Sequence, residues 1–303
     1  MGHKRKQQRR KQLEKKRARK QYKDTVFRML FREKEHLMEL YNAVSGRNCT
    51  DLNLLEIVTL ENAIYMGVKN DLAFLVDFHL YLYEHQSTVN LNMPFRFLQY
   101  VTEEYGRLTA KENIYGSRRV PIPAPHFVVF YNGISPYPER QVMRLSDAFR
   151  MQENEPQLEL RVLILNINEG YNTELKKRCR TLDEYMQYVD RVRGYAAFMS
   201  METAVDRAVD ECISEGILSD FLLANKAEVK RMSIYEYDEE ATRQAIRIEE
   251  YERGIEKGIG VLIRDGIENG LEKKVIIEKL IKGFEISETS AENYYEDIYR
   301  VDS

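Results

Sequence analysis

The sequence has few cysteines, no long apolar run and little net charge, and each of these shortages excludes a class of protein. Its three cysteines, Cys49, Cys179 and Cys212, lie far apart and form no Cys-x-x-Cys pair, which excludes a disulfide framework and a zinc site. No apolar stretch approaches the ~20 residues of a membrane-spanning helix, and no apolar signal core follows the charged start. We therefore expect a cytoplasmic protein without a membrane partner.

The net charge of −3 conceals an uneven distribution of charge. Residues 1–20 hold eleven lysines and arginines against one acidic residue, so this segment carries about +10 and the rest of the chain about −13. A basic arm on an acidic body predicts a polyanionic partner, with DNA as the first choice. A solvated, disordered tail is the alternative interpretation. The DNA contacts that we expect in this arm are Lys4, Arg5, Lys6, Arg9 and Arg10.

Apolar spacing divides the middle of the chain into helices and strands. It predicts helices at 24–45, 92–108, 181–199 and 201–225, and strands at 70–76, 79–87, 126–131 and 158–167. Residues 54–57 and 63–68 are compatible with short strands or with a helical turn. Because strands and helices alternate, the order favours an α/β fold in which a mixed sheet is covered on both faces.

From about residue 236 the sequence becomes highly charged and is interrupted by glycines. Gly254, Gly258, Gly266 and Gly270 are spaced by multiples of four, so on a helix they form a ridge of small residues. A glycine inside a helix costs up to ~1 kcal/mol relative to alanine, which calls for a packing explanation. We expect homo-oligomerisation through this helix, with a frayed tail as the alternative, and a final helical hairpin at 271–302.

The most strand-like segment of the chain, residues 70–90, contains Asp71, Glu84 and Gln86. If 70–76 and 79–87 pair as an antiparallel hairpin that turns at Asp77-Phe78, Asp71 falls opposite Glu84 and Lys69 falls opposite Gln86. Side chains alternate along a strand, so Gln86 shares the face of Glu84. The remaining members of this face are the core residues Ala73, Leu75, Leu80 and Leu82.

Two carboxylates that face each other across a hairpin repel, and a divalent cation between them would remove the repulsion. A small number of hard oxygen ligands suits Mg²⁺, which keeps waters that a phosphate can displace. The alternative is that both carboxylates lie in solvent at the rim of the sheet. A shift of the register by one residue would place them on opposite faces.

Four phrases of the sequence resemble a known family in their order along the chain. “LYEHQST” after a strand aspartate, then “MPFRFLQYV”, “FVVFYNG” and “RLSDAF”, are similar to the Rpn family of recombination-promoting nucleases, also called YhgA-like putative transposases, of the PD-(D/E)xK nuclease superfamily. The resemblance covers roughly residues 23–225. It implies a restriction-endonuclease-like fold, a mixed β-sheet flanked by helices, between the basic arm 1–22 and a helical C-terminal region 226–303.

The resemblance also implies roles for individual residues. Asp71 and Glu84 take the positions of the metal ligands, for Mg²⁺ or alternatively Mn²⁺, with the backbone carbonyl of His85 as a further ligand. Gln86 stands in the catalytic position where most of the superfamily has lysine, and it can hydrogen-bond a water but carries no charge. We expect Lys69 to supply the missing ammonium.

The roles of several other polar residues near this segment are predicted less narrowly. Arg96, in the following helix, is expected to reach a phosphate or pair with Glu84, and a solvated helix face is its alternative. We expect Tyr100 in the core and the side chains of His79 and His85 on the face away from the carboxylates. A further acid upstream could be any of Glu39, Glu56 and Glu61.

The activity implied is Mg²⁺-dependent hydrolysis of DNA phosphodiester bonds with little sequence preference, by an endonuclease that promotes recombination. The word transposase in the family name does not imply strand transfer, because the motif supports hydrolysis alone. Two other functions remain open. One is a catalytically degenerate nuclease fold that binds DNA or another partner, and the other is an oligomerising scaffold that acts through the C-terminal helix.

Overall fold

The computed structural model describes residues 26–58 and 71–302. The chain divides into two compact units, with the boundary between Glu236 and Tyr237, and each unit is described by itself below. Asp24, Lys69, the segment 63–68 and the basic arm lie outside the described residues. No described helix combines the length and the apolar character that crossing a bilayer demands.

The first unit is built on one six-stranded sheet with the strand order β1-β2-β3-β4-β6-β5. The strands are β1 Leu55–Ile57, β2 Leu72–Val76, β3 His79–Gln86, β4 Ala124–Tyr131, β5 Arg140–Arg144 and β6 Arg161–Asn166. The strand β4 runs parallel to both β3 and β6, whereas β1, β2 and β5 join the sheet by antiparallel pairing. The sheet is therefore mixed, as expected from the sequence.

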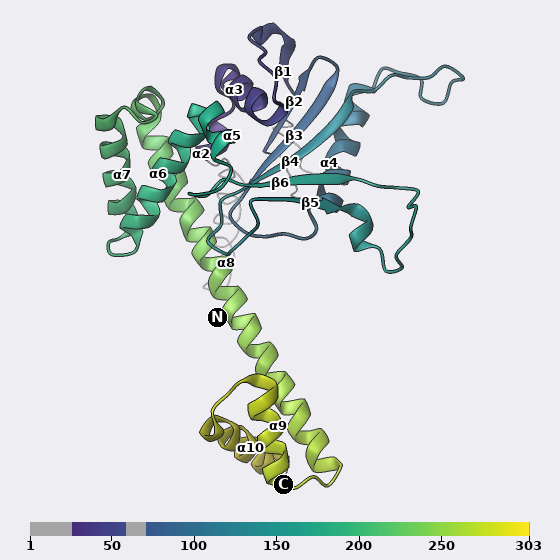
Figure 1. Ribbon diagram of the computed structural model, residues 1–303, viewed down its shortest axis with the longest axis vertical. Coiled ribbons are helices and arrows are strands. Elements are labelled where there is room, and N and C mark those ends of the chain that lie inside the picture. Colours follow the sequence, from purple (N-terminus) through teal and green to yellow (C-terminus); the bar gives the residue numbers. More distant parts are fainter. Residues whose placement is uncertain (1–25, 59–70, 303) are drawn as a thin grey trace, which may run out of the picture. The chain divides into compact units, whose positions relative to one another are not determined.

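Helices cover both faces of this sheet, which confirms the predicted mixed α/β fold (Figure 1). The helices of the first unit are α2 Val26–Leu30, α3 Lys34–Ser45, α4 Met93–Leu108, α5 Thr173–Arg178, α6 Arg180–Ala196 and α7 Met201–Glu215. The helix α4 packs Met93 and Phe97 against Leu82 and its neighbours in one core cluster. On the other face, Phe27 of α2 stacks on His85 with a ring-centroid distance of 4.8 Å. Side chains of β3 therefore point alternately toward α4 on one face of the sheet and toward α2 on the other.

The hairpin β2–β3 has the register expected from the sequence. Leu72 pairs with Tyr83 and Val76 with His79, and extending this register by one pair places Asp71 opposite Glu84. Asp77 and Phe78 form the turn with φ angles of 45° and 60°, the positive values that match a two-residue turn to the twist of its strands. The predicted apolar members of the α4 face are confirmed, because Ala73, Leu80 and Leu82 lie in the same core cluster as α4.

Other elements differ from the expectation. The first helix breaks into α2 and α3 at residues 31–33, although apolar spacing continues across the break. The edge strand β5 and the short helix α5 were not predicted, since neither has a long apolar repeat. The stretch 201–225, expected as one helix, is two: Gly216, with φ +77°, ends α7, and the next helix begins at Ser219.

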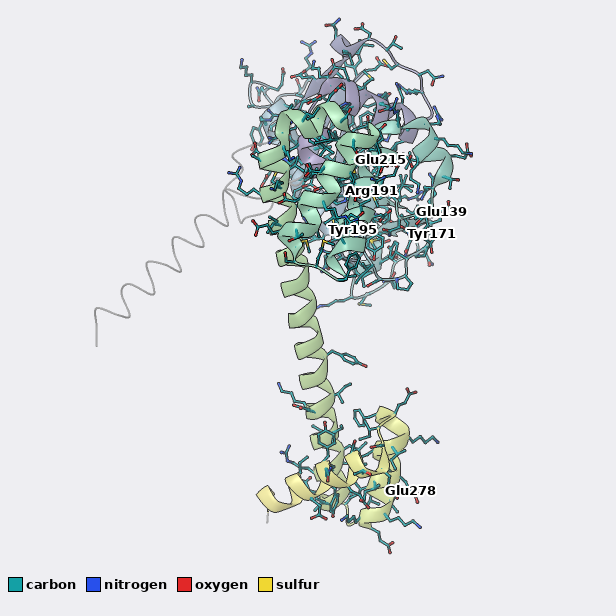
Figure 2. The ribbon with its side chains drawn as sticks, turned by 90° about the vertical axis from the view of Figure 1, so that its left-hand side faces the viewer. Glu139, Tyr171, Arg191, Tyr195, Glu215 and Glu278 are labelled. Carbon is teal, nitrogen blue, oxygen red and sulfur yellow. The ribbon has the colours of Figure 1, made fainter. Side chains whose placement is uncertain are left out.

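The helices α6 and α7 form an antiparallel pair that is closed by polar contacts. Arg191 donates to both carboxylate oxygens of Glu215, at 3.0 and 2.5 Å, and Figure 2 labels both side chains. At the start of α6, Glu39 accepts hydrogen bonds from the backbone N–H groups of Arg180 and Thr181. This carboxylate therefore caps a helix, where a negative charge is favourable.

The helix α8, Ser219–Glu268, begins in the first unit, and its one non-helical residue, Asn225, lies at the end of the domain expected from the sequence. In the second unit, α8 packs with α9 Lys273–Phe284 and α10 Glu288–Asp302, which confirms the predicted final hairpin. The core of this unit consists of Ile259, Ile263, Ile276, Ile277, Leu280, Ala291 and Tyr295.

Two of the four regularly spaced glycines face side chains of this same chain. A Cβ atom at Gly266 would lie 2.8 Å from Ile276, and one at Gly258 would lie 3.2 Å from the ring of Phe284. Gly270 ends the helix with φ +68°. Packing within the chain thus explains the glycines at 258 and 266, for which the sequence suggested contact with a second copy.

Candidate active site

Glu84 is the buried carboxyl group at the centre of the candidate site. It lies near the end of β3 on the face covered by α4, and the residue is 3% exposed. Its Oε2 atom lies 3.7 Å from Nη2 of Arg96. Its Oε1 atom is also buried and has no hydrogen-bond partner among the described residues. Burying an unsatisfied carboxyl oxygen is costly, so this atom needs an explanation.

Asp71 lies immediately before β2, opposite Glu84. Its Oδ2 atom accepts a hydrogen bond of 2.8 Å from the backbone N–H of His85, which fixes the carboxylate over the end of β3. The two acids interact electrostatically, since the charge of Asp71 raises the pKa of Glu84. The hairpin thus brings Asp71 and Glu84 together, as the register required.

Arg96, in the first turn of α4, is the cation of this cluster. Its Nε and Nη2 atoms donate to the hydroxyl of Tyr100 at 3.1 and 2.7 Å. We assign the side-chain amide of Gln86 in the orientation that satisfies both of its polar atoms: its oxygen then lies 2.8 Å from Nη1 of Arg96 and its nitrogen 3.3 Å from the carbonyl oxygen of Thr88. The side chain of Arg96 is 28% exposed, so the expected alternative of a solvated helix face is wrong.

Burial dominates the electrostatics of the site. Loss of solvation raises the pKa of Glu84 well above its usual range, Asp71 raises it further, and Arg96 only partly opposes the shift. Burial also raises the pKa of Tyr100, so its hydroxyl keeps its proton and donates or accepts as a neutral group. Burial thus disfavours the ionised form of Glu84, and the charge of Asp71 adds to this effect.

The candidate site offers a divalent cation two carboxylate groups as oxygen ligands. The unpartnered Oε1 of Glu84 and the nearby carboxylate of Asp71 are hard oxygen donors, which Mg²⁺ and Mn²⁺ prefer. A cation beside Glu84 would favour its ionised form, against the effect of burial. Within residues 26–58 and 71–302, no group of three or more His, Cys, Asp or Glu side chains could hold a metal. A bound ion would therefore rely on two carboxylates, backbone oxygen and water.

The side chain of His85 points away from these acids, as expected. It stacks on Phe27, and its Nε2 lies 3.3 Å from the hydroxyl of Tyr185. Burial, with a smaller effect of Arg193, lowers the pKa of His85 to about 3, so the imidazole is neutral. His79 lies on the same face and packs near Tyr81.

The remaining predicted residues do not join the cluster or lie outside the described residues. Glu39 caps α6, and Glu56 of β1 is exposed and pairs with Leu75, toward the apolar end of the face. Lys69, Glu61 and the five basic residues of the arm lie outside the described residues.

Two features of the site were not anticipated from the sequence. Tyr100 is buried as expected, but its hydroxyl also binds Arg96, a contact that their spacing of four on a helix could have suggested. The second feature is Gly133, which follows β4. A Cβ atom there would lie 2.1 Å from the carbonyl oxygen of Ser87, next to Gln86, so this glycine permits the two loops to meet.

Comparison with known proteins adds no family assignment. A scan against protein-family models, a search of curated proteins and a search of solved structures each found no match.

Proposed function

We propose that this protein is a Mg²⁺-dependent deoxyribonuclease that hydrolyses phosphodiester bonds with little sequence preference and so promotes recombination. Mn²⁺ is the alternative metal. A restriction-endonuclease-like fold belongs to the same proposal, which the mixed sheet flanked by helices supports. The sequence resemblance to the Rpn family supplies the reaction class.

One observation carries the proposal more than any other. The hairpin register sets Asp71 opposite Glu84, and Oε1 of Glu84 is buried without a hydrogen-bond partner among the described residues. A fold gains no stability from a buried carboxyl oxygen that lacks a hydrogen-bond partner beside a second acid. Perturbed acids of this kind are frequent at functional sites, because catalysis can require what stability does not.

The resemblance to the Rpn family assigns the metal ligands. Asp71, Glu84 and the backbone carbonyl of His85 would hold Mg²⁺, and the backbone N–H of His85 keeps Asp71 in place. Mg²⁺, when bound, polarises the phosphate and lowers the pKa of a bound water. The low exposure of Glu84 keeps bulk water from its carboxylate, which strengthens each electrostatic interaction in the site.

Plasmid cleavage tests the proposal. Supercoiled DNA is incubated with Mg²⁺, Mn²⁺ or EDTA and the full-length protein, beside the variant Glu84→Ala. We expect nicking by the wild type with either metal, none in EDTA and none by the variant. Equal nicking by both proteins would identify a contaminating nuclease and remove the proposal, as would no cleavage at any metal concentration.

A basic arm would add phosphate contacts to this site. Each phosphate contact made by lysine or arginine steepens the dependence of DNA affinity on salt, with a slope of about −0.9 per contact on duplex DNA. We expect deletion of residues 1–22 to flatten this dependence, measured by fluorescence anisotropy across a salt series. An unchanged slope would show that the arm does not contact DNA.

A catalytically degenerate DNA-binding protein is the second candidate function. The observation that favours it is the uncharged Gln86, whose side-chain oxygen is already occupied by Arg96. This candidate predicts DNA binding that needs no metal and survives Glu84→Ala, without cleavage under any condition.

A further inference from the structure

The position equivalent to the superfamily's lysine carries no charge in this chain, yet a cation lies beside it. Arg96 reaches this point from α4, and its Nη1 atom lies 2.8 Å from the side-chain oxygen of Gln86. Its Nη2 atom lies 3.7 Å from Oε2 of Glu84. The positive charge is therefore within the cluster, although a different residue supplies it.

Glutamine at position 86 and arginine at position 96 are matched to each other. The amide oxygen of Gln86 accepts from the guanidinium, whereas a lysine ammonium has three donors and no acceptor. Lysine at position 86 would also place a second positive charge against Arg96. Glutamine at position 86 is therefore compatible with Arg96 in a way that lysine is not.

The guanidinium is held in one orientation. Tyr100 accepts from both Nε and Nη2, and Gln86 accepts from Nη1, so contacts engage three sides of the planar group. A group fixed in this way loses little conformational entropy when it binds a phosphate, and its fork matches phosphate oxygens. The side chain remains 28% exposed, which leaves access from outside.

We propose that Arg96 is a catalytic residue of this site, which contacts the scissile phosphate and supplies the positive charge that Gln86 lacks. This inference rests on the proposed function. In the reaction, a water oxygen forms a bond to phosphorus while the bond from phosphorus to the leaving deoxyribose oxygen breaks. The proton of the water passes to solvent, the leaving oxygen takes up a proton, and Arg96 keeps its own protons while it neutralises charge on the phosphate oxygens.

Variants of the full-length protein test the assignment. We expect Arg96→Met to lower kcat by about 10²–10³-fold, the usual loss for one group that stabilises charge in the transition state. Arg96→Lys should recover at least tenfold of that loss. The double variant Gln86→Lys/Arg96→Met should also recover activity, because the cation returns to position 86. Arg180→Met is the matched control: it removes a guanidinium that is 80% exposed on α6, outside the candidate site, and it should cleave like the wild type.

Binding of Mn²⁺, followed by calorimetry without DNA, provides a second measurement. We expect Arg96→Met to bind Mn²⁺ at least as tightly as the wild type, because the variant removes a competing cation, and Asp71→Asn to bind it more weakly.

Cleavage by Arg96→Met within threefold of the wild type would overturn the assignment, and so would weakened Mn²⁺ binding by this variant. If Glu84→Ala abolishes cleavage while Arg96→Met does not, only the role of Arg96 falls. If the wild type fails to cleave, the proposed function falls, and the role of Arg96 with it.

Discussion

Glu84 and His85 are neighbours in the sequence and both are buried, but they enter different layers of the fold. Glu84 faces α4, where one of its oxygens has no hydrogen-bond partner among the described residues. His85 faces α2 and α6, where it stacks on Phe27 and lies within hydrogen-bond distance of Tyr185. Burial alone therefore does not indicate function. The useful distinction is whether the surroundings satisfy the buried group.

The largest difference that we expect between the two faces is in catalysis. Changes to groups that support metal ligands cost about 10–100-fold in metal affinity or activity, so loss of a ligand should cost more than about 100-fold. Glu84→Gln should therefore abolish cleavage while His85→Phe, which keeps a ring against Phe27, cleaves within a few-fold of the wild type. Plasmid nicking at saturating Mg²⁺ measures both, with melting temperatures as the folding control. Equal losses in the two variants would contradict the division between the faces.

A smaller difference concerns the dependence of stability on pH. Because burial lowers the pKa of His85 from 6.5 to about 3, the folded protein binds fewer protons than the unfolded chain between these values. The stability that neutral His85 contributes is fully present above pH 6.5 and is lost as the pH falls, by up to about 1.4 kcal/mol per unit. His85→Phe should flatten this slope in urea unfolding between pH 6.5 and 5. An unchanged slope would assign the acid sensitivity to other groups.

The smallest effect expected is that of the Tyr185 hydroxyl. Tyr185→Phe removes its contact with Nε2 of His85, at 3.3 Å, and should lower the free energy of unfolding by about 1 kcal/mol. Cleavage should stay unchanged, because this contact lies on the face away from Glu84. Tyr100→Phe is the matched change on the other face, where the lost hydroxyl positions Arg96, and it should reduce kcat. Similar effects of both variants on kcat would contradict the predicted functional difference between the two faces.

The sequence predicted the arrangement of the carboxylates because strand geometry leaves little freedom. Side chains alternate with a period of two, and a two-residue turn at Asp77-Phe78 sets the register, so the pairing of Asp71 with Glu84 follows from counting. The face of each residue along β2 and β3 follows in the same way. These predictions depend only on local backbone rules.

The remaining features depend on contacts that the sequence does not encode locally. The hydroxyl of Tyr100 accepts from Arg96, one turn earlier on α4, and the spacing of the two residues is equally that of an aromatic residue packed in the core. The edge strand β5 has only one buried residue, Met143, so it lacks the pattern of a core strand. The glycines of α8 indicated a close approach, but only the folded chain identifies Ile276 and Phe284 as its partners.

Gly133 makes the candidate site vulnerable to a change that removes no charge and no hydrogen-bonding side chain. An added methyl group would meet the carbonyl oxygen of Ser87 at 2.1 Å, and the shift needed to relieve that overlap would reach the adjacent Gln86. A random mutagenesis screen for loss of cleavage should therefore recover substitutions here alongside those at the acids. Such an allele would retain every proposed reactive group, so it would probe the alignment of these groups separately from their chemistry.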